Sequence, residues 1–239
     1  MIDGTCHACD RDYAYQQYYW GAHGAIEDTY QCIFCNHIFR DYRESVEEYH
    51  MEKYRASGEE GHNMYPKAER LKFISSIIQF LQPYLNSKQN ALEIGSGDGL
   101  FASQVAPLVG NIICSDIDTK MTDKCKALGL EAINENVLEL NDQKYDIVFG
   151  FDVLEHVLDI QQFKDKMATM VSELLVLQVP VDRTMVPPNP RFDGHSHYFC
   201  QTSIIKLFQD VFTPEKIVYG YRGQFARGPE LFCIFRKNT

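Results

Sequence analysis

Several features that mark other classes of protein are missing from this sequence. No apolar run approaches the roughly 18 residues that cross a bilayer, and the first ten residues carry neither the basic nor the apolar part of a secretory signal. Acidic residues outnumber basic ones by 33 to 23, so the chain lacks the excess of Lys and Arg that a general phosphate-binding surface needs. We therefore expect a cytoplasmic protein that binds neither membranes nor nucleic acid.

The eight cysteines are distributed unevenly. Four of them stand alone in apolar or helical stretches and are interpreted as small buried hydrophobic residues: Cys114, Cys125, Cys200 and Cys233. The other four form two C-x-x-C pairs separated by 22 residues: Cys6, Cys9, Cys32 and Cys35. Two residues between thiolates let one turn present both sulfurs to a single tetrahedral ion, and this spacing is close to that of four-cysteine zinc sites.

The segment between the two pairs is aromatic and polar and has no core of its own, so it needs a metal to fold. The sequence thus predicts a structural zinc ion in a small zinc ribbon over residues 1–45. Four thiolates complete the coordination shell and leave no open position for catalysis. Iron in the same tetrahedron and redox-active dithiols are the alternatives.

Residues 46–67 are charged and tyrosine-rich and are expected to form a helical connector or lid before a domain over residues 68–239. Strands are predicted at 90–95, 111–117, 130–136, 145–151, 173–181, 215–222 and 230–237. Helices are predicted at 68–85, 100–109, 119–129, 162–171 and 202–212. Strands that alternate with helices indicate an α/β fold with a doubly wound, mostly parallel seven-stranded sheet, closed by an antiparallel hairpin.

The stretch ALEIGSGDGLF, residues 91–101, reads as a buried strand followed by a tight glycine loop. A dinucleotide fingerprint would need a sixth-position glycine, but residue 100 is leucine. Glu93 and Asp98 flank the loop and would repel a pyrophosphate, whereas they suit a sulfonium and an amino group. Asp116 ends the next strand, where it is placed to accept the hydroxyls of a ribose. A ribose with a cationic tail describes S-adenosylmethionine.

These residues carry a family resemblance. In LEIGSGDG, CSDID and YDIVFGFDVLEHVLD, the segment 68–236 resembles class I SAM-dependent methyltransferases, which have a Rossmann-like fold. The last motif is similar to that of small-molecule methyltransferases, including those of ubiquinone biosynthesis. A zinc-ribbon N-terminus resembles sugar-modifying methyltransferases of nucleotide-sugar and surface-glycan pathways. The resemblance implies that the cofactor is bound by Glu93, Gly95, Ser96, Gly97, Asp116, Ile117, Asn136, Val137 and Phe151.

Some of these residues have a structural alternative. Ile117 and Phe151 could belong to the core, and Asp116 could cap the following helix. An O or N acceptor usually has to lose its proton during methyl transfer. The loop after the fifth strand offers His195 and His197, with Asp193 to orient one of them, and His156 follows the fourth strand. The alternative for all three histidines is that they only fix the local structure.

Four arginines lie in two loops on the expected cofactor side and suggest an anionic substrate, because guanidinium groups match phosphate and carboxylate oxygens: Arg183, Arg191, Arg222 and Arg227. A solvated rim without a ligand is the alternative. Tyr65, with Tyr49 and Tyr54, could close over the site or pack within the connector.

The expected activity is methyl transfer from S-adenosylmethionine to a small anionic molecule such as a nucleotide-linked sugar or glycan precursor. Oxygen is favoured over nitrogen or carbon as the acceptor atom. One rival is a nucleic-acid methyltransferase or binding module whose zinc ribbon grips the nucleic acid, although no D-P-P-Y or N-P-P-Y motif is present. Another is a catalytically silent SAM-binding partner subunit. The sequence does not predict an oligomeric state.

Overall fold

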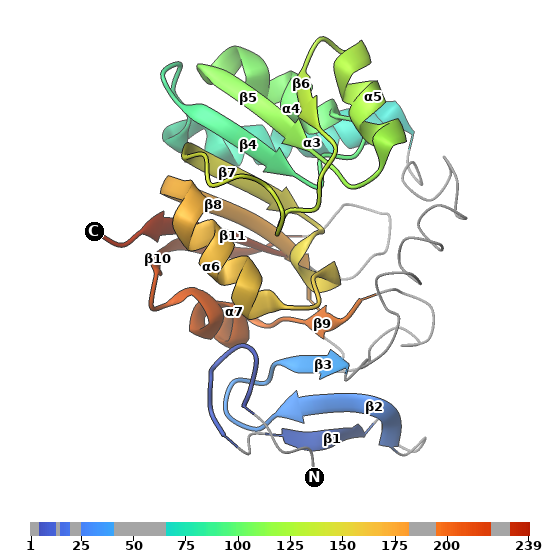
Figure 1. Ribbon diagram of the computed structural model, residues 1–239, viewed down its shortest axis with the longest axis vertical. Helices are drawn as coiled ribbons and strands as arrows, with labels where there is room; N and C mark the ends of the chain where they lie inside the picture. The colour runs from blue at the N-terminus through green and yellow to red at the C-terminus, as the bar shows by residue number, and fades with distance from the viewer. Residues whose placement is uncertain (1–4, 13–14, 20–24, 41–65, 182–194, 221–229) are drawn as a thin grey trace. The chain divides into compact units, whose positions relative to one another are not determined.

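The computed structural model of the chain describes residues 5–12, 15–19, 25–40, 66–181, 195–220 and 230–239 (Figure 1). Their strands form two sheets, one with the order β10-β11-β8-β7-β4-β5-β6 and one with the order β1-β2-β3-β9. Contacts group the chain into two compact units. Unit 1 comprises residues 1–46, 152–168 and 175–239, and unit 2 comprises residues 47–151 and 169–174.

The seven-stranded sheet confirms the predicted fold class. Its strands are β4 (Asn90–Ile94), β5 (Asn111–Ser115), β6 (Glu131–Ile133), β7 (Tyr145–Phe151), β8 (Val171–Pro180), β10 (Phe212–Gly220) and β11 (Glu230–Lys237). Strand β4 pairs in parallel with both β5 and β7, and β5 pairs in parallel with β6. The closing hairpin of β10 and β11 is antiparallel, as the sequence predicts.

Unit 2 is built around β4, whose residues 91–94 are all buried, as expected of a strand in the interior of a parallel sheet. Its helices are α3 (Lys67–Leu81), α4 (Leu100–Val105) and α5 (Thr119–Ala127), with short 3-10 turns η2 (Gln82–Tyr84) and η3 (Ala106–Leu108). Helix α3 buries Ile74, Ile77 and Leu81, which recur at helical spacing. It ends where Pro83 enters the 3-10 turn, because proline cannot continue the helical hydrogen bonds.

Unit 1 contains the 3-10 turn η4 (Leu154–His156), most of helix α6 (Ile160–Met170) and helix α7 (Gln201–Phe208). The predicted helix over 202–212 is too long, because α7 ends at Phe208 and Phe212 already pairs with Lys237 in the sheet. The rings of Phe163, Phe212 and Phe235 pack around Phe208. The sequence pattern would allow the helix to continue to Phe212. Phe212 instead begins strand β10, where its ring is buried against Phe208.

The small sheet of unit 1 contains three N-terminal strands, β1 (Tyr15–Tyr19), β2 (Ala25–Cys32) and β3 (Ile38–Arg40). Its fourth strand is β9 (His197–Tyr198), which comes from the loop after β8 and pairs antiparallel with β3 (Figure 1). The domain boundaries at residues 45 and 67 stay a prediction, and residues 41–65 lie outside the described part of the chain.

Within the described residues, no helix has the length and apolar character needed to cross a membrane.

Candidate functional site

The loop after β4 has the backbone of a ligand-binding turn. Gly95, Gly97 and Gly99 all have positive φ, at 60°, 53° and 73°, a region that strongly favours glycine. The amide of Ser96 donates to the carbonyl of Ser115 at the end of β5, and this bond holds the loop against the neighbouring strand at 3.0 Å. The loop therefore lies at the carboxyl edge of β4 and β5, where open α/β sheets bind their ligands.

Three carboxyl groups surround this loop. Glu93 is buried on β4, and its Oε2 accepts a hydrogen bond of 3.2 Å from the amide of Ala102 in the first turn of α4. Burial, reinforced by the nearby Cys125 sulfur, raises the pKa of Glu93 well above its usual value. Burial opposes the ionisation of Asp98 as well, but Arg70 outweighs it and lowers the pKa. The two guanidinium nitrogens of Arg70 lie 2.6 and 2.7 Å from the Asp98 carboxylate.

Asp116 is the third acid, and it organises the turn between β5 and α5. Its Oδ2 accepts from the amide of Gly97 and its Oδ1 from the amide of Asp118, both at 2.9 Å. The cap of α5 is Asp118, whose side chain accepts from the amide of Lys120. The helix-capping role that the sequence analysis considered for Asp116 is therefore taken by Asp118. The Asp116 carboxylate bridges the glycine loop and the end of β5.

The predicted adenine-side residues fall on two neighbouring segments of unit 2. Ile117 is 41% exposed, which is unusual for a large apolar side chain and does not fit a core position. Asn136 and Val137 are half-buried after β6, and Asn136 accepts from the amide of Leu138. Sequence reasoning missed Asn134, whose amide donates to the Asp116 carbonyl at 2.9 Å and so fixes this turn.

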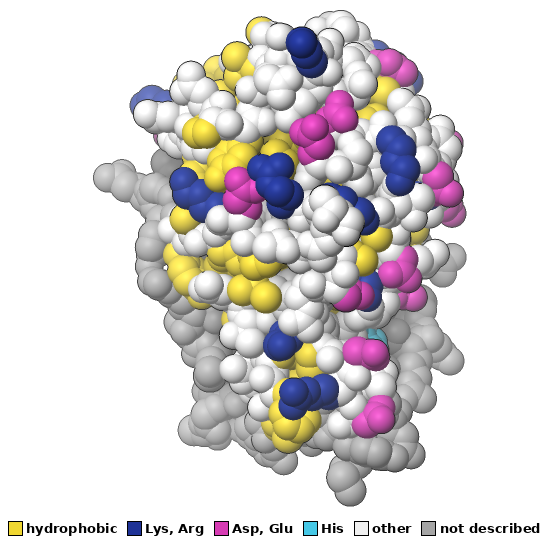
Figure 2. Space-filling model, turned by 90° about the vertical axis from the view of Figure 1, so that its left-hand side faces the viewer, with side chains coloured by type: hydrophobic (Ala, Val, Ile, Leu, Met, Phe, Trp, Pro, Cys, Tyr) yellow, Lys and Arg dark blue, Asp and Glu magenta, His cyan; other side chains and the backbone are white. Residues whose placement is uncertain are grey.

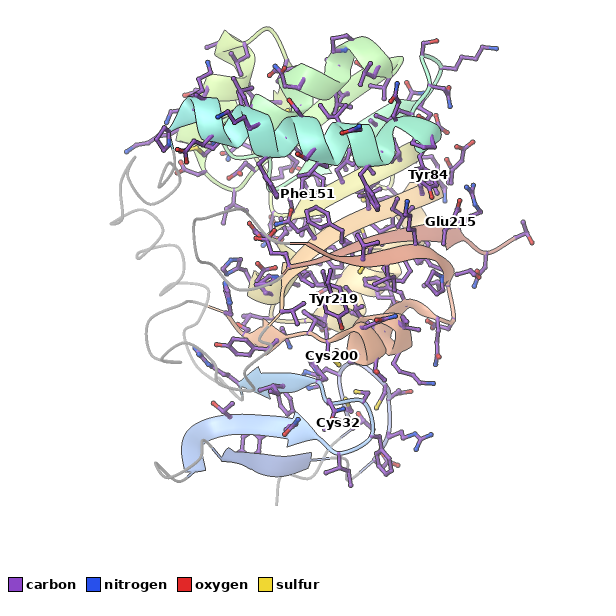
Figure 3. All side chains as sticks on the ribbon, turned by 180° about the vertical axis from the view of Figure 1, so that it is seen from behind. Cys32, Tyr84, Phe151, Cys200, Glu215 and Tyr219 are labelled. Atoms are coloured by element: carbon purple, nitrogen blue, oxygen red, sulfur yellow. The ribbon has the colours of Figure 1, made fainter. Side chains whose placement is uncertain are left out.

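Phe151 is the last residue of β7 (labelled in Figure 3) and is half-buried. Its ring lies edge-on to that of Phe101 in α4, with ring centroids 4.7 Å apart. Phe101 packs in the same way against Phe149 at 5.2 Å. Phe151 is therefore partly supported by the core and keeps part of its ring accessible.

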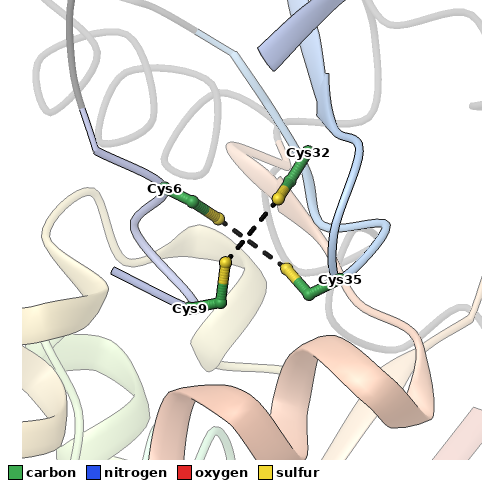
Figure 4. A group of neighbouring side chains, drawn as sticks. All are labelled: Cys6, Cys9, Cys32 and Cys35. Atoms are coloured by element: carbon green, nitrogen blue, oxygen red, sulfur yellow. Dashed lines mark hydrogen bonds between the residues drawn. The ribbon is translucent and has the colours of Figure 1, made fainter. Parts of the chain in front are cut away.

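The four N-terminal cysteines come together in one cluster (Figure 4). Their sulfurs all lie within 4.8 Å of one another, and the pairs Cys6–Cys35 and Cys9–Cys32 are each separated by 3.7 Å. Four sulfurs bound to one zinc ion at about 2.3 Å stand ~3.8 Å apart. The thiols are free rather than disulfide-bonded. The cluster is compatible with a small zinc site.

Both C-x-x-C pairs form the same tight turn. Asp10 and Asn36, which follow the two pairs, have positive φ of 55° and 59°. Their amides donate to the carbonyls of Cys6 and Cys32, at 2.8 and 3.0 Å. The backbone alone thus presents two sulfurs from each turn to one centre. Of the four solitary cysteines, Cys114, Cys125 and Cys233 are buried, as expected.

The cysteine cluster is joined to the β9 segment by several contacts. The partly exposed Cys200 (labelled in Figure 3) donates its thiol to the Cys35 carbonyl. The ring of His197 stacks on that of His37, with 3.2 Å between Nδ1 and Nε2. The other ring nitrogen of His197 lies 3.1 Å from the Leu158 carbonyl oxygen. Burial lowers the pKa of His197 well below its usual value, and nearby His37 adds to the effect.

His156 and His195, two further base candidates, lie side by side. Their rings are nearly perpendicular, with centroids 4.8 Å apart, and both side chains are half-buried. Glu155 completes a group of three whose ligand atoms lie within 4.8 Å of one another. Sequence reasoning missed Glu155, although it stands next to His156 in the motif.

The predicted substrate residues Arg183, Arg191, Arg222, Arg227 and Tyr65 lie outside the described residues, as does Asp193.

Comparison with known proteins agrees with this architecture. A family model described as "Methyltransferase domain" matches residues 65–211, more than half of the chain. No curated protein sequence matches significantly. The chain belongs to the methyltransferase-domain family, and its fold is that of class I SAM-dependent methyltransferases. The protein is a SAM-dependent methyltransferase.

Three solved structures illustrate the similarity of fold. The N-methyltransferase NodS from Bradyrhizobium japonicum WM9, in complex with S-adenosyl-L-homocysteine, is 18% identical with a TM-score of 0.64, over 82% of this chain and 100% of that one. Magnesium protoporphyrin IX methyltransferase (ChlM) from Synechocystis PCC 6803 with bound SAM is 14% identical with a TM-score of 0.65, over 83% and 100%. Burkholderia thailandensis 1,6-didemethyltoxoflavin-N1-methyltransferase, with bound 1,6-didemethyltoxoflavin and S-adenosylhomocysteine, is 14% identical with a TM-score of 0.65. The match covers 87% of this chain and 98% of that one.

The first prediction concerns packing of the glycine loop. A Cβ on Gly99 would stand 2.8 Å from Cys125 Sγ, whereas a Cβ on Gly129, which also has positive φ, meets nothing within 4 Å. We expect Gly129→Ala to cost about 1–2 kcal/mol of unfolding free energy through backbone strain alone. Gly99→Ala should cost a further ~1–3 kcal/mol from overpacking. Urea denaturation measures both, and equal losses would contradict the packing argument.

The second prediction concerns the ionisation of Glu93. Because its pKa is raised in the folded state, the folded protein binds more protons than the unfolded chain between the usual and the raised pKa, so stability falls as pH rises through this window. Glu93→Gln removes this titration. We expect the wild type without ligand to lose stability relative to Glu93→Gln as the pH rises. The difference in melting temperature, variant minus wild type, should therefore increase from pH 4 to pH 8. Glu139→Gln, an exposed control, should show a constant difference.

Proposed function

We propose that the protein transfers the methyl group of S-adenosylmethionine to an oxygen atom of a small anionic molecule, such as a nucleotide-linked sugar or a glycan precursor. The observation that carries the donor assignment is the ring of carboxyl groups around the glycine loop. Asp116 binds the loop amide of Gly97 directly, and Glu93 is buried behind the loop. The Asp116 carboxylate disfavours a pyrophosphate at this loop, whereas a sulfonium or ammonium group would be attracted to it and would favour the ionisation of Glu93.

The donor would place its ribose at Asp116 and its methionine part along Gly95, Ser96 and Gly97. The buried Glu93, whose raised pKa favours the neutral acid, would ionise more readily with the donor's ammonium group nearby. The exposed Ile117 offers an apolar face for adenine, with Asn136 and Val137 at its edge. Phe151 would contact the donor with the accessible part of its ring.

The transfer itself is an in-line displacement. The bond between the methyl carbon and sulfur breaks as the bond between carbon and the acceptor oxygen forms, and the neutral thioether S-adenosylhomocysteine leaves. The acceptor's hydroxyl proton must pass to a protein group or to water. His156 and His195 suit this role by their partial exposure. His197 does not, because it is buried and both its ring nitrogens face other groups.

The acceptor assignment draws on the sequence. Arg183, Arg191, Arg222 and Arg227 are expected to bind its phosphate or carboxylate groups. Two of the structural neighbours are named for methylation of small molecules, magnesium protoporphyrin IX and 1,6-didemethyltoxoflavin, which is in keeping with a small acceptor.

A nucleic-acid substrate is less well supported. Residues 1–45 contain only Arg11, Arg40 and Arg43 as basic residues, and Arg40 is 7% exposed. On the face shown in Figure 2, basic and acidic side chains are interspersed and the described residues form no continuous basic patch. Free thiols throughout the chain are in keeping with a reducing compartment, and we place the protein in the cytoplasm.

Zinc at Cys6, Cys9, Cys32 and Cys35 would hold structure rather than take part in the reaction, since four thiolates close its shell. A zinc ion there would also stabilise the position of His195, because backbone hydrogen bonds connect β3 to the segment before β9. The amide of Arg40 donates to the Ser196 carbonyl at 3.0 Å, and the amide of Ser196 donates to the Glu155 carbonyl at 2.8 Å. The metal would thus fix the segment that carries His195.

A prediction for the donor site compares two neighbouring acids. Asp116→Asn should weaken the affinity for S-adenosylmethionine about ten-fold or more in calorimetry, because the ribose hydroxyls lose a charged acceptor. Asp118→Asn makes the same change of charge two residues away. Asparagine caps helices as well as aspartate does, so this control should leave affinity and stability nearly unchanged. Equal affinities in both variants would mean that the ribose lies elsewhere.

A further prediction separates the zinc ribbon from the donor site. Cys9→Ser, at the least buried of the four cysteines, should lower the bound zinc and reduce methyl transfer to a responsive acceptor, found by screening nucleotide sugars with labelled donor, by ten-fold or more. The affinity for S-adenosylmethionine should change less than two-fold, because the glycine loop and Asp116 make their contacts within unit 2. Unimpaired turnover in a zinc-free variant would refute the positioning role.

A further inference from the structure

A buried thiol lies against the glycine loop. Cys125 is a residue of α5, and its side chain is fully buried. Its Sγ lies 3.4 Å from the carbonyl oxygen of Gly97 and 3.6 Å from Oγ of Ser96. We propose that Cys125 is a positioning residue for the methyl donor, because its thiol holds the Gly97 carbonyl in the orientation that the loop needs to bind the donor.

Helix α5 brings this thiol to the loop. Its buried residues are Met121, Thr122 and Cys125, which recur at helical spacing and form one face. The helix packs directly on the loop at this face, since a Cβ added to Gly99 would stand only 2.8 Å from Cys125 Sγ and 3.3 Å from Cys125 Cα. The bare backbone of Gly99 therefore leaves the space that the sulfur occupies.

The direction of each hydrogen bond follows from the groups involved. A carbonyl oxygen can only accept, so the Cys125 thiol donates its single hydrogen to Gly97. The Ser96 hydroxyl must then be the donor toward the sulfur. Hydrogen bonds from Cys114 and Ser96 lower the pKa of the Cys125 thiol to about 7, although burial opposes its ionisation. Below this pKa the sulfur carries the hydrogen that the Gly97 carbonyl accepts.

Asp116 and Cys125 hold two sides of the same glycine. The Gly97 amide donates to Asp116 Oδ2 at 2.9 Å, and the Gly97 carbonyl accepts from Cys125. The amide belongs to the peptide unit before Gly97 and the carbonyl to the unit after it, so two successive peptide units of the loop are fixed. Both partners come from one stretch of chain, which runs from the turn after β5 into α5.

Hydrogen bonds matter at this position because packing does not restrict it. Gly97 has a φ of 53°, and a Cβ added to it would meet no atom of the described residues within 4 Å. Glycine reaches left-handed and right-handed backbone conformations about equally easily, so the peptide unit after Gly97 could turn over at little steric cost. The bond from the Cys125 thiol selects one orientation.

The consequence for the donor rests on the donor site proposed above, where the methionine part of S-adenosylmethionine would lie along Gly95, Ser96 and Gly97. A loop whose peptide units already have their bound orientation loses less conformational freedom when the donor binds. Without the thiol, the donor has to order the Gly97 carbonyl itself, which weakens its binding. One neutral hydrogen bond corresponds to about a three- to ten-fold difference in affinity.

Two substitutions remove the thiol with opposite effects on volume. Cys125→Ala leaves a small gap, whereas Cys125→Val adds a methyl group, and neither side chain can donate a hydrogen bond. A loss of affinity shared by both variants must therefore come from the lost bond rather than from packing. We expect calorimetry on the full-length, zinc-loaded protein, about one pH unit below the pKa of Cys125, to show about three- to ten-fold weaker binding of S-adenosylmethionine in both. If one variant fails to fold, the other still provides the test.

Cys233→Ala is the matched control. Cys233 is as fully buried as Cys125, and its thiol makes no hydrogen bond with another residue in the described part of the chain. The control should lose stability to a similar extent as Cys125→Ala, whereas its affinity for the donor should change by less than about two-fold. Infrared difference spectra add a signature of the bond itself. The S–H stretching band that Cys125→Ala removes should lie at lower frequency than the band that Cys233→Ala removes, because a hydrogen bond weakens the S–H bond.

Donor affinity equal to that of the wild type in the folded Cys125 variants, or a loss in only one of two folded variants, would overturn the positioning role. S–H bands at the same frequency in both difference spectra would do so as well. Asp116→Asn, measured alongside, separates this result from a failure of the proposed donor site. Weaker binding in Asp116→Asn alone refutes only the role of Cys125. Unchanged binding of S-adenosylmethionine in all of these variants would place the donor away from the glycine loop and overturn both proposals.

Discussion

Parallel pairing of β4 with β5 and β7 is the constraint on which the proposed donor site depends. Because parallel strands end at the same edge, the glycine loop, Asp116 and the end of β7 are brought to one edge of the sheet in unit 2. Asp116 then uses this proximity, since its carboxylate reaches back to the amide of Gly97. The donor site that we propose is therefore a consequence of strand order, and its acidic residues are the basis on which we propose a cationic ligand for it.

The N-terminal cysteine segment has a less obvious relation to the enzyme. Its third strand takes β9 as a partner, and the same two residues of β9 contribute the buried His197 and the Tyr198 that packs against His195. The N-terminal segment thereby pairs with a part of the chain that lies between β8 and β10 of the seven-stranded sheet.

Much of the fold and of the donor loop could be predicted because their signals are local. The glycine positions are set by backbone angles within a few residues, the strands by continuous apolar runs, and the C-x-x-C turns by their own hydrogen bonds. The end of α7 could not be predicted in this way, because burial of Phe212 among distant aromatic rings decides it. The pairing of β9 with β3 could not be predicted from the sequence either, because a strand of two residues has no periodic pattern.

The sequence by itself determined the α/β class, the two cysteine pairs and the glycine loop with its acids, because each depends on residues close together in the chain. Only the tertiary structure decided how three similar histidines differ. His197 is enclosed by His37 and the Leu158 carbonyl, while His156 and His195 meet beside Glu155. The physical reason is that burial and the approach of side chains from separate segments depend on chain packing, which residue type and spacing do not encode.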